Sequence, residues 1–258
     1  MVTEEPGERV ATVHTAFEIV SYVQESRGAR LTDVAAHLDI AKSTAHRHIR
    51  YLESQGYLVE TDGEYHVGLR FLDHGIHARE RIEWIELAET RTATLADETG
   101  ELCNFMVEQN GWCYILCREK GPSAVETGSR IGKPLYLHTT AGGKAILSCL
   151  PERRVRRIVR QRGLPKHTET TVEDTDQLLA DLATVRERGY AVNDEEHIPG
   201  LMALGAPVIG AGDVVLGALC ISGPSNRLGD RRTADLAQQL LGAVNELELN
   251  IKYTRPHR

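Results

Sequence analysis

The sequence predicts an α+β protein built from two parts, and three observations support this prediction. In the first part of the chain, apolar residues recur at steps of three and four, which is the period of amphipathic helices. Asp62-Gly63 and Asn110-Gly111 each separate two strand-like runs, which is the pattern of a β-hairpin. After Gly100, strand-like and helical runs mix without a repeated β-α-β unit, which indicates helices packed on an antiparallel sheet.

Length and composition fit one large domain or two ordinary ones. The chain has 258 residues, of which 41% are hydrophobic and 26% are charged, so it can form a packed core. No apolar run approaches the roughly 18 residues of a membrane span. The stretch "MVTEEPGERV" lacks a basic segment followed by an apolar one, so we expect no secretory signal. The 5 cysteines are an odd number and widely scattered, which favours reduced thiols and a cytoplasmic protein.

Residues 1–72 are predicted to form three helices followed by a hairpin. The first helix, "VHTAFEIVSYVQE", ends at Gly28, and Thr32 is the expected N-cap of the second helix, "LTDVAAHL". Ser43 is the expected cap of a third helix that ends at Gly56, before the Asp62-Gly63 hairpin. This order is that of a winged helix-turn-helix domain. The residues expected on the buried face of the first helix are Val13, Ala16, Phe17, Val20 and Val23.

The third helix contains the segment "KSTAHRHIRYL", in which positive charge points to one side. If Ala45, Ile49 and Leu52 are buried, the opposite side presents Ser43, Arg47 and Arg50 to solvent. A solvated basic face on a bundle helix is the alternative, but the preceding helices and the following hairpin favour a recognition helix. The residues predicted to contact DNA are Thr32, Lys42, Ser43, Thr44, His46, Arg47 and Arg50, with Tyr65 and His66 near the tip of the wing.

The overall charge argues mildly against nucleic-acid binding. The formal net charge is -7, and residues 1–78 hold seven Lys or Arg against twelve Asp or Glu, a balance of -5. The same residues hold seven of the 11 histidines. Because only the groove-facing surface must attract phosphate, the domain can be acidic elsewhere, and we expect a shallow salt dependence of binding.

Residues 73–99 are predicted to form one long linker helix. Ile82, Ile85, Ala88, Thr92 and Leu95 recur at helical spacing along it. It can be an ordinary connector, or its side with Trp84 and Ile85 can form a dimer surface.

Residues 100–258 are predicted to form a second domain around an antiparallel sheet. Two strands flank Asn110-Gly111, helices follow at about 141–150, 152–162 and 174–188, and strands return at "YAVN", "MALGAPVI" and "VVLGALCIS". A last amphipathic helix spans about 230–250.

Six segments resemble those of IclR-type transcriptional regulators. They are "TAFEIVSYV", "LTDVAAHLDIAKSTAHRHIRYLESQGYL", "YHVGLRFLDHG", "GKPLYLHTTAGGKAIL", "ERGYAVNDEEHIPGLMALGAPV" and "GALCISGPSNRL", and the resemblance spans roughly residues 10–250. It implies a winged-helix DNA reader, a dimerising linker helix and a GAF-like domain that binds a small effector. It further implies dimers or tetramers that bind palindromic operators and regulate a catabolic pathway.

The segment "HTTAGGKA" is predicted to be a glycine-rich turn that opens a helix capped by Thr140. It lacks the spacing of a phosphate loop, whereas free N–H groups at a helix start suit a small carboxylate. Close packing of helix on sheet is the alternative role of the glycines. By the resemblance, the effector is an organic acid, such as a sugar acid or an aromatic acid. The residues that the resemblance assigns to the pocket are Leu135, Ala141, Gly142, Asn193, Leu201, Ala203, Cys220 and Ser222.

Enzymatic and metal sites are disfavoured. The acidic segment "NDEEH" at 193–197 has the wrong spacing for two metal ligands on one helix face, so a solvated loop is favoured. Cys113 and Cys117 fall on one face of a strand with Ile115, which indicates core, with a zinc site using His138 or Cys103 as the alternative. No nucleophile-and-base motif is present. We therefore expect a DNA- and effector-binding regulator without cofactor, metal or catalytic residues, and the rival is a metal-dependent or acyl-transfer enzyme with a winged-helix partner-binding module.

Overall fold

The computed structural model describes residues 10–253, without the side chains of residues 230 and 231. The start of the chain, on which the expectation of no secretory signal depends, lies mostly outside the described residues. Contacts divide the chain into two compact units, which meet in sequence between Arg81 and Ile82. None of the described helices is long and apolar enough to cross a membrane.

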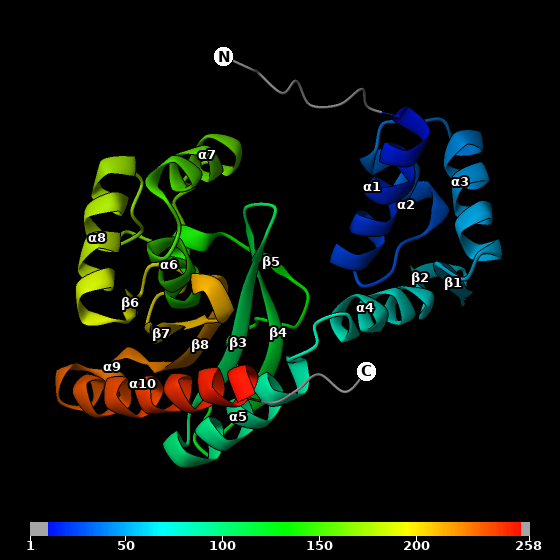
Figure 1. Cartoon of the computed structure of the whole chain (residues 1–258). Helices are drawn as coiled ribbons and strands as arrows, with labels where there is room; N and C mark the ends of the chain where they lie inside the picture. The colour runs from blue at the N-terminus through cyan, green and yellow to red at the C-terminus, as the bar shows by residue number, and fades with distance from the viewer. Residues whose placement is uncertain (1–9, 254–258) are drawn as a thin grey trace. The chain divides into compact units, whose positions relative to one another are not determined.

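The N-terminal unit confirms the predicted winged helix-turn-helix (Figure 1). Its elements in order are α1 (Ala11–Glu25), α2 (Leu31–His37), α3 (Lys42–Ser54), β1 (Leu58–Thr61), β2 (Glu64–Val67) and α4 (Arg70–Glu80). The strands β1 and β2 pair antiparallel, and the turn between them has φ of 54° at Asp62 and 80° at Gly63, as a tight hairpin requires.

The buried face of α1 differs from the prediction. Ile19, Val20 and Val23 are buried, whereas Val13 is 52% exposed and Phe17 is 59% exposed. The apolar residues of α1 cover an arc wider than the face that the rest of the unit covers, and Val13 and Phe17 lie at its outer edge. Periodicity identifies the arc but not the part of it that is buried.

Both N-caps predicted in the N-terminal unit are wrong. Thr32 and Ser43 are each the second residue of their helix, and the N-cap positions are Arg30 and Ala41. At α2, the Asp33 carboxylate accepts a hydrogen bond from the backbone N–H of Arg30 (3.2 Å), so an acid inside the first turn supplies the capping contact. Gly56, with φ of 76°, follows α3 as predicted.

The single helix predicted over residues 73–99 is wrong. α4 ends at Glu80, and α5 (Ile85–Thr99) begins after a four-residue break, residues 81–84, that contains neither Gly nor Pro. Ile82 and Trp84 in the break pack against the core of the C-terminal unit, and the Trp84 ring lies 5.3 Å from that of Phe105. Tertiary packing therefore overrides local helix propensity here. Ile85 is buried in this core and Trp84 is half-buried against it, so their packing does not favour the dimer surface that the sequence suggested, which stays a prediction.

The C-terminal unit is an antiparallel sheet covered by helices on both faces, which confirms the α+β prediction (Figure 1). The strand order is β5-β4-β3-β8-β7-β6. The strands are β3 (Leu102–Gln109), β4 (Trp112–Lys120), β5 (Pro134–Leu135), β6 (Ala191–Asp194), β7 (Leu201–Ile209) and β8 (Val215–Pro224). One face carries α5, the short α9 (Ser225–Leu228) and α10 (Asp230–Tyr253); the other carries α6 (Ala141–Ser148), α7 (Glu152–Arg162) and α8 (Thr175–Arg188). The short 3-10 helices η1 (Leu137–Thr139) and η2 (Ala211–Asp213) complete the unit.

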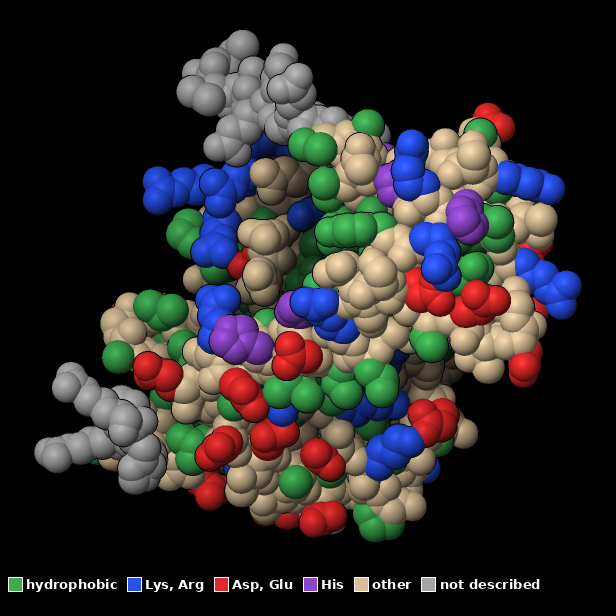
Figure 2. All heavy atoms as spheres, turned by 90° about the vertical axis from the view of Figure 1, so that its right-hand side faces the viewer, with side chains coloured by type: hydrophobic (Ala, Val, Ile, Leu, Met, Phe, Trp, Pro, Cys, Tyr) green, Lys and Arg blue, Asp and Glu red, His purple; other side chains and the backbone are tan. Residues whose placement is uncertain are grey.

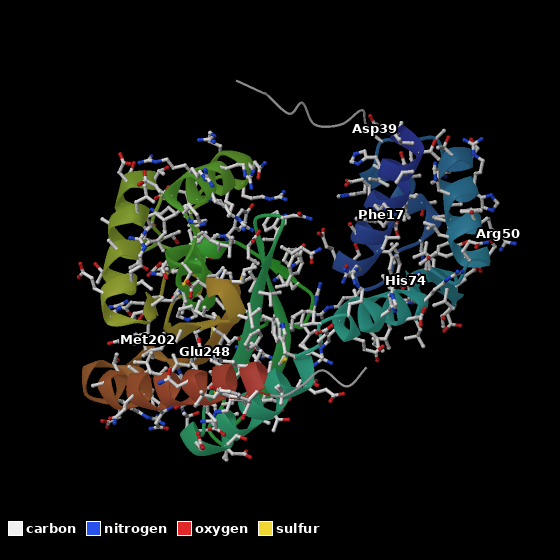
Figure 3. The ribbon with its side chains drawn as sticks, viewed as in Figure 1. Phe17, Asp39, Arg50, His74, Met202 and Glu248 are labelled. Carbon is white, nitrogen blue, oxygen red and sulfur yellow. The ribbon has the colours of Figure 1, made fainter. Side chains whose placement is uncertain are left out.

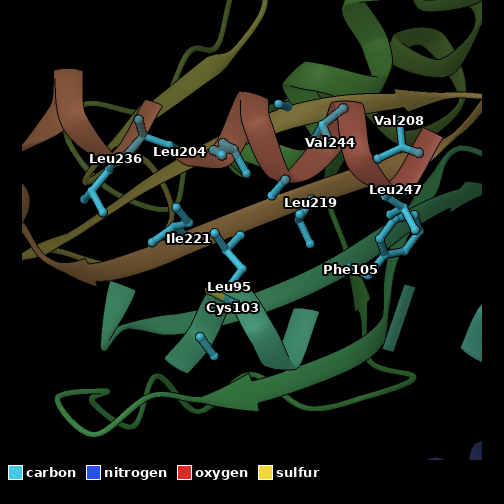
Figure 4. Close-up of a cluster of buried hydrophobic side chains, with 14 of the residues drawn as sticks. Leu95, Cys103, Phe105, Leu204, Val208, Leu219, Ile221, Leu236, Val244 and Leu247 are labelled. Carbon is cyan, nitrogen blue, oxygen red and sulfur yellow. The ribbon is translucent and has the colours of Figure 1, made fainter. Parts of the chain in front are cut away.

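A hydrophobic core fills each side of this sheet. On the α5 and α10 side, Leu95, Phe105 and Leu219 are fully buried between the helices and the strands, with Leu247 beside them (Figure 4). The same side holds Glu101, which is 0% exposed and forms ion pairs with Arg227 and Arg232. These pairs connect the start of β3 to α9 and α10.

The predicted common face of Cys113 and Cys117 is wrong. Cys113 and Ile115 belong to the core on the α6 side, whereas Cys117 belongs to the core on the α10 side. The register between β3 and β4 shifts between Phe105 and Met106, which is a β-bulge that turns the following side chain to the other face. The two thiols therefore do not share a site.

Gly205→Ala should destabilise the C-terminal unit by about 2 kcal/mol or more, because a Cβ at Gly205 would lie 2.6 Å from the backbone carbon of Ala141 and would push α6 off the sheet. Gly242→Ala in α10 is the matched control, since its Cβ meets nothing within 4 Å and should stabilise the helix by about 0.5–1 kcal/mol. Denaturant unfolding followed by tryptophan fluorescence measures both, because both tryptophans, Trp84 and Trp112, lie in this unit. Equal effects of the two substitutions would contradict the close packing.

Candidate DNA interface and effector pocket

The α3 helix presents its polar side to solvent, as predicted. Ala45 and Ile49 are 0% exposed and Leu52 is 9% exposed, and they anchor the helix in the N-terminal unit. Figure 2 views the molecule from the α3 side and shows Lys, Arg and His side chains interspersed on this face. Of the predicted DNA contacts on α3, Thr44 is half-buried and the others are exposed: Lys42, Ser43, His46, Arg47 and Arg50.

The two arginines of α3 differ in their availability. Arg50 points away from the domain (Figure 3), but its guanidinium pairs with the Glu53 carboxylate at 2.8 Å, which offsets its charge. No ion pair of Arg47 is found among the described residues. Arg47 is therefore the more available donor for a base edge or a phosphate.

The position of Tyr65 does not favour the predicted wing contact. Tyr65 is 8% exposed and packs in the core of the N-terminal unit, where its backbone exchanges hydrogen bonds with Ala29 (2.8 and 3.1 Å). Side chains alternate along a strand, so His66 faces the other way, half-buried against Gly28. The exposed hairpin residues include Glu60 and Asp62, whose charge repels phosphate.

Thr32, predicted as a DNA contact at the start of α2, is exposed. Its hydroxyl donates to the Asp33 carboxylate (3.2 Å), and nothing in the structure distinguishes it as a binding group.

A pocket of about 60 Å³ lies in the C-terminal unit between the start of α6 and the sheet. All of the residues that the sequence assigned to the effector line it, namely Leu135, Ala141, Gly142, Asn193, Leu201, Ala203, Cys220 and Ser222. They come from five segments that are far apart in the chain. The sheet register brings them together, because Asn193 pairs with Ala203 and Ala203 pairs with Ser222 on adjacent strands.

Sequence reasoning missed about half of the lining. Strands β3 and β4 add Asn104, Met106 and Ile115. Loops and helix starts add Thr127, Ser129, Thr139, Thr140, His197 and Ile198. The available signal was alternation in "LCNFMV", where Asn104 and Met106 share a face, but the sequence does not reveal that this face meets α6.

The start of α6 is tightly organised. The Thr140 hydroxyl accepts a hydrogen bond from the Gly143 N–H (3.0 Å), which confirms the predicted cap. At Gly142, an added Cβ would lie 2.7 Å from the sulfurs of Cys220 and Met106, so the helix approaches the sheet as only glycine permits. The glycines of "HTTAGGKA" thus provide both the close packing and the open helix terminus that the sequence left as alternatives.

The acidic segment after β6 supports this helix. Asn193 donates through its amide to the Thr139 carbonyl and accepts a hydrogen bond from the Glu196 N–H (3.1 Å). Glu196 forms a buried ion pair with Lys144 of α6. The segment is therefore a structural brace and not the solvated loop that its charges suggested. Among the described residues, no three His, Cys, Asp or Glu side chains are placed to hold a metal ion.

The pocket lining is uncharged at neutral pH. It contains no Lys, Arg, Asp or Glu. Burial lowers the pKa of His197 to about 4, with a further contribution from the nearby His167 and Lys133, and burial raises the pKa of the Cys220 thiol well above its usual value. The favourable place for an anion is therefore the positive end of the α6 dipole.

Comparison with known proteins identifies the family. The model of the bacterial transcriptional regulator IclR C-terminal domain matches residues 76–249, and that of the IclR helix-turn-helix domain matches residues 12–62. The chain belongs to the IclR family of transcriptional regulators.

The chain is similar over nearly its whole length to a curated relative and, in fold, to two solved structures. The chain is 32% identical to a probable HTH-type transcriptional regulator, ArcR, of Halobacterium salinarum over 95% of both chains. The crystal structure of Thermotoga maritima IclR superposes with a TM-score of 0.77 at 23% identity, over 95% of this chain and 100% of that one. An IclR homolog from Microbacterium hydrocarbonoxydans, complexed with 4-hydroxybenzoate, superposes with a TM-score of 0.78 at 18% identity, over 93% and 99%. The family and the curated relatives are regulators, so the rival prediction of an enzyme is wrong.

Acidification should destabilise the C-terminal unit. Burial also lowers the pKa of His138 to about 4, as for His197, whereas an unfolded histidine titrates near 6.5. The unfolded state therefore binds more protons between these values, and the stability present above about pH 6.5 is lost as pH falls towards 4. Tryptophan-monitored unfolding should show this decline and show it reduced in His138→Gln. The control His14→Gln removes an exposed histidine of the other unit and should leave the decline unchanged; an equal reduction in both variants would refute the assignment.

Proposed function

We propose that this IclR-family member binds a palindromic operator through two copies of α3 and that a small organic acid in the C-terminal pocket alters this binding. The convergence of the predicted effector residues on the start of α6 is the observation that supports it. A carboxylate placed there meets backbone N–H groups and the positive end of the helix dipole in a pocket without competing charges.

The size of the pocket favours a small ligand. At about 60 Å³ it has room for roughly four to six water-sized groups, which suits an acid of few atoms better than a full sugar acid. The structural relative bound to 4-hydroxybenzoate supports an organic acid. An aromatic acid of that size would require the pocket to open.

The α4 helix provides the surface for a second copy of the chain. None of its residues is buried, and an apolar stripe at steps of three and four begins at its N-cap, Leu69 (83% exposed), and continues through Leu72 (58%) and Ile76 (46%). Phe71 of α4 packs on the core of the N-terminal unit, and the apolar stripe lies on the side that this core leaves uncovered, where packing against another helix would stabilise it. Two N-terminal units joined in this way would match the two half-sites of a palindrome.

Thermodynamic linkage sets the condition under which ligand binding can change DNA binding. The acid can change operator affinity only if it binds one arrangement of the dimer more tightly than another. The regulated genes of such a protein belong to the breakdown of the acid or of its precursor, and the protein acts where the chromosome is, in the cytoplasm.

Fluorescence-anisotropy titration of operator DNA tests this function. Candidate DNA comes from genomic fragments enriched by the purified protein, and Arg47→Ala should weaken binding to it by about 1–3 kcal/mol if Arg47 contacts a base. Glu53→Gln is the matched variant, which frees Arg50 from its partner and should leave affinity unchanged or strengthen it. The titration is repeated with organic acids, of which at least one should shift the affinity. Unchanged affinity in Arg47→Ala, or no shift with any acid, would contradict the respective half of the proposal.

Leu72→Glu should dissociate the assembly, because it places a charge in the centre of the apolar stripe of α4. Sedimentation of the purified protein should then show mostly monomer, with operator affinity at least tenfold lower. Val214→Glu changes an equally exposed apolar residue (57%) of the C-terminal unit and should leave the assembly intact. A Leu72→Glu protein that sediments like the unmodified protein would show that α4 is not the interface.

A further inference from the structure

The α7 helix concentrates positive charge in a chain that is acidic overall. Six of its 11 residues are arginine and only Glu152 is acidic, although Asp and Glu outnumber Lys and Arg in the whole chain, 37 to 30. Val155 and Ile158 are buried in the core on the α6 side of the sheet. The helix packs beside α8 (Figure 1), and its side opposite Val155 and Ile158 is exposed to solvent.

The arginines of α7 fall into two groups. Arg154, Arg156 and Arg162 are engaged within the unit, where their guanidinium groups bond to Glu108, Glu152, Asp176 and the Asn110 carbonyl. The other three, Arg153, Arg157 and Arg160, are exposed, and no ion pair or hydrogen bond of their side chains is found among the described residues. These three are called the arginine stripe.

The arginine stripe forms one line on the side of α7 that faces away from the core. Its members are spaced by four and three residues, so they lie above one another on the helix surface. Like charges at these spacings repel one another and destabilise the helix. Since no carboxylate of the described residues pairs with the stripe, an anion from outside the chain is what would relieve this repulsion.

The chemistry of this face favours a phosphate backbone over an acidic protein. No apolar side chain of α7 is exposed, whereas protein interfaces depend on a few aromatic or apolar anchors. Phosphate binding needs only charge and hydrogen-bond donors, and a guanidinium donates two parallel bonds to phosphate oxygens. The stripe covers about 10 Å of helix axis, and phosphates of one DNA strand recur about every 3.4 Å along the duplex, so three arginines can reach about three phosphates.

We infer that the arginine stripe of α7 binds the phosphate backbone of duplex DNA, as a second and sequence-independent DNA contact in the C-terminal unit. This inference goes beyond the proposed function, in which α3 binds the operator and the pocket binds an acid. The stripe supplies phosphate contacts that the acidic N-terminal unit provides only at α3, and it strengthens binding to operator and nonoperator DNA alike.

The salt dependence of nonoperator DNA binding by the full-length protein tests this inference. Each phosphate contact contributes about 0.9 to the slope of log affinity against log salt concentration. Arg153→Gln combined with Arg157→Gln should therefore lower the slope by about 1.8 per chain and weaken binding about tenfold or more at low salt. Fluorescence-anisotropy titrations of one duplex over a series of potassium chloride concentrations measure both quantities.

Arg188→Gln combined with Lys252→Gln is the control of equal charge. Both residues are exposed, and neither has an ion pair among the described residues. Arg188 lies at the end of α8, about 18 Å along that helix from the Asp176 contact with α7, and Lys252 lies on α10, on the other face of the sheet. A general effect of net charge lowers the slope equally in both double variants, whereas a phosphate contact lowers it only when the arginine stripe is changed.

Arg153→Lys combined with Arg157→Lys keeps the charge and should retain most of the slope. Tryptophan-monitored unfolding verifies that each variant folds. An unchanged slope in the glutamine variant of the stripe, or an equal loss in the control, would overturn the inference. Loss of binding to poly-glutamate, with DNA binding unchanged, would also overturn it and would assign the stripe to an acidic protein. Preference for the operator over nonoperator DNA reports on α3, so its absence in the unmodified protein would contradict the proposed function and not this inference.

Discussion

The close packing of α6 on the sheet is the constraint on which the C-terminal unit depends. Gly142 of the helix and Gly205 of β7 leave no room for a Cβ, so the helix backbone lies directly against the strands, and Gly143 packs equally closely on Leu137 of η1. The Thr140 hydroxyl caps the first turn of α6, and the buried ion pair of Lys144 with Glu196 ties the helix to the segment that follows β6. The pocket is the space that this packing leaves at the helix terminus, and its small size follows from it.

In both units, the distribution of charged residues follows the proposed binding site. The N-terminal unit is acidic outside α3, and even within α3 the Glu53 carboxylate offsets Arg50. In the proposed function, the exposed face of α3 carries the contacts to DNA, and the acidic residues around it limit nonspecific phosphate binding. In the C-terminal unit, Lys144 and Glu196 beside the pocket pair with each other, and the pocket lining itself is neutral. The helix dipole then dominates the field that a ligand meets.

An uncovered apolar surface marks a place that needs a partner. The core of the N-terminal unit leaves the apolar stripe of α4 exposed. The stripe is costly in an isolated chain, and the second copy of the chain that we propose would cover it. An assembly of this kind, together with a ligand site, is what a ligand-dependent regulator requires.

The sequence by itself determined what short-range chemistry controls. The hairpins at Asp62-Gly63 and Asn110-Gly111, the Thr140 cap and the outward face of α3 were predicted correctly, because each depends on residues within a few positions of one another. The effector residues were found through a resemblance, and their convergence on one pocket depends on strand pairing that no local pattern specifies.

Only the tertiary structure decided the rest. Burial of Ile82 and Trp84 interrupts the predicted linker helix, and a β-bulge separates Cys117 from Cys113. Strand alternation and core packing bury Tyr65, which the sequence had placed against DNA. Asn104 was identified as a pocket residue only when β3 was seen to face α6. In each case, long-range packing chooses among conformations that the local sequence permits equally.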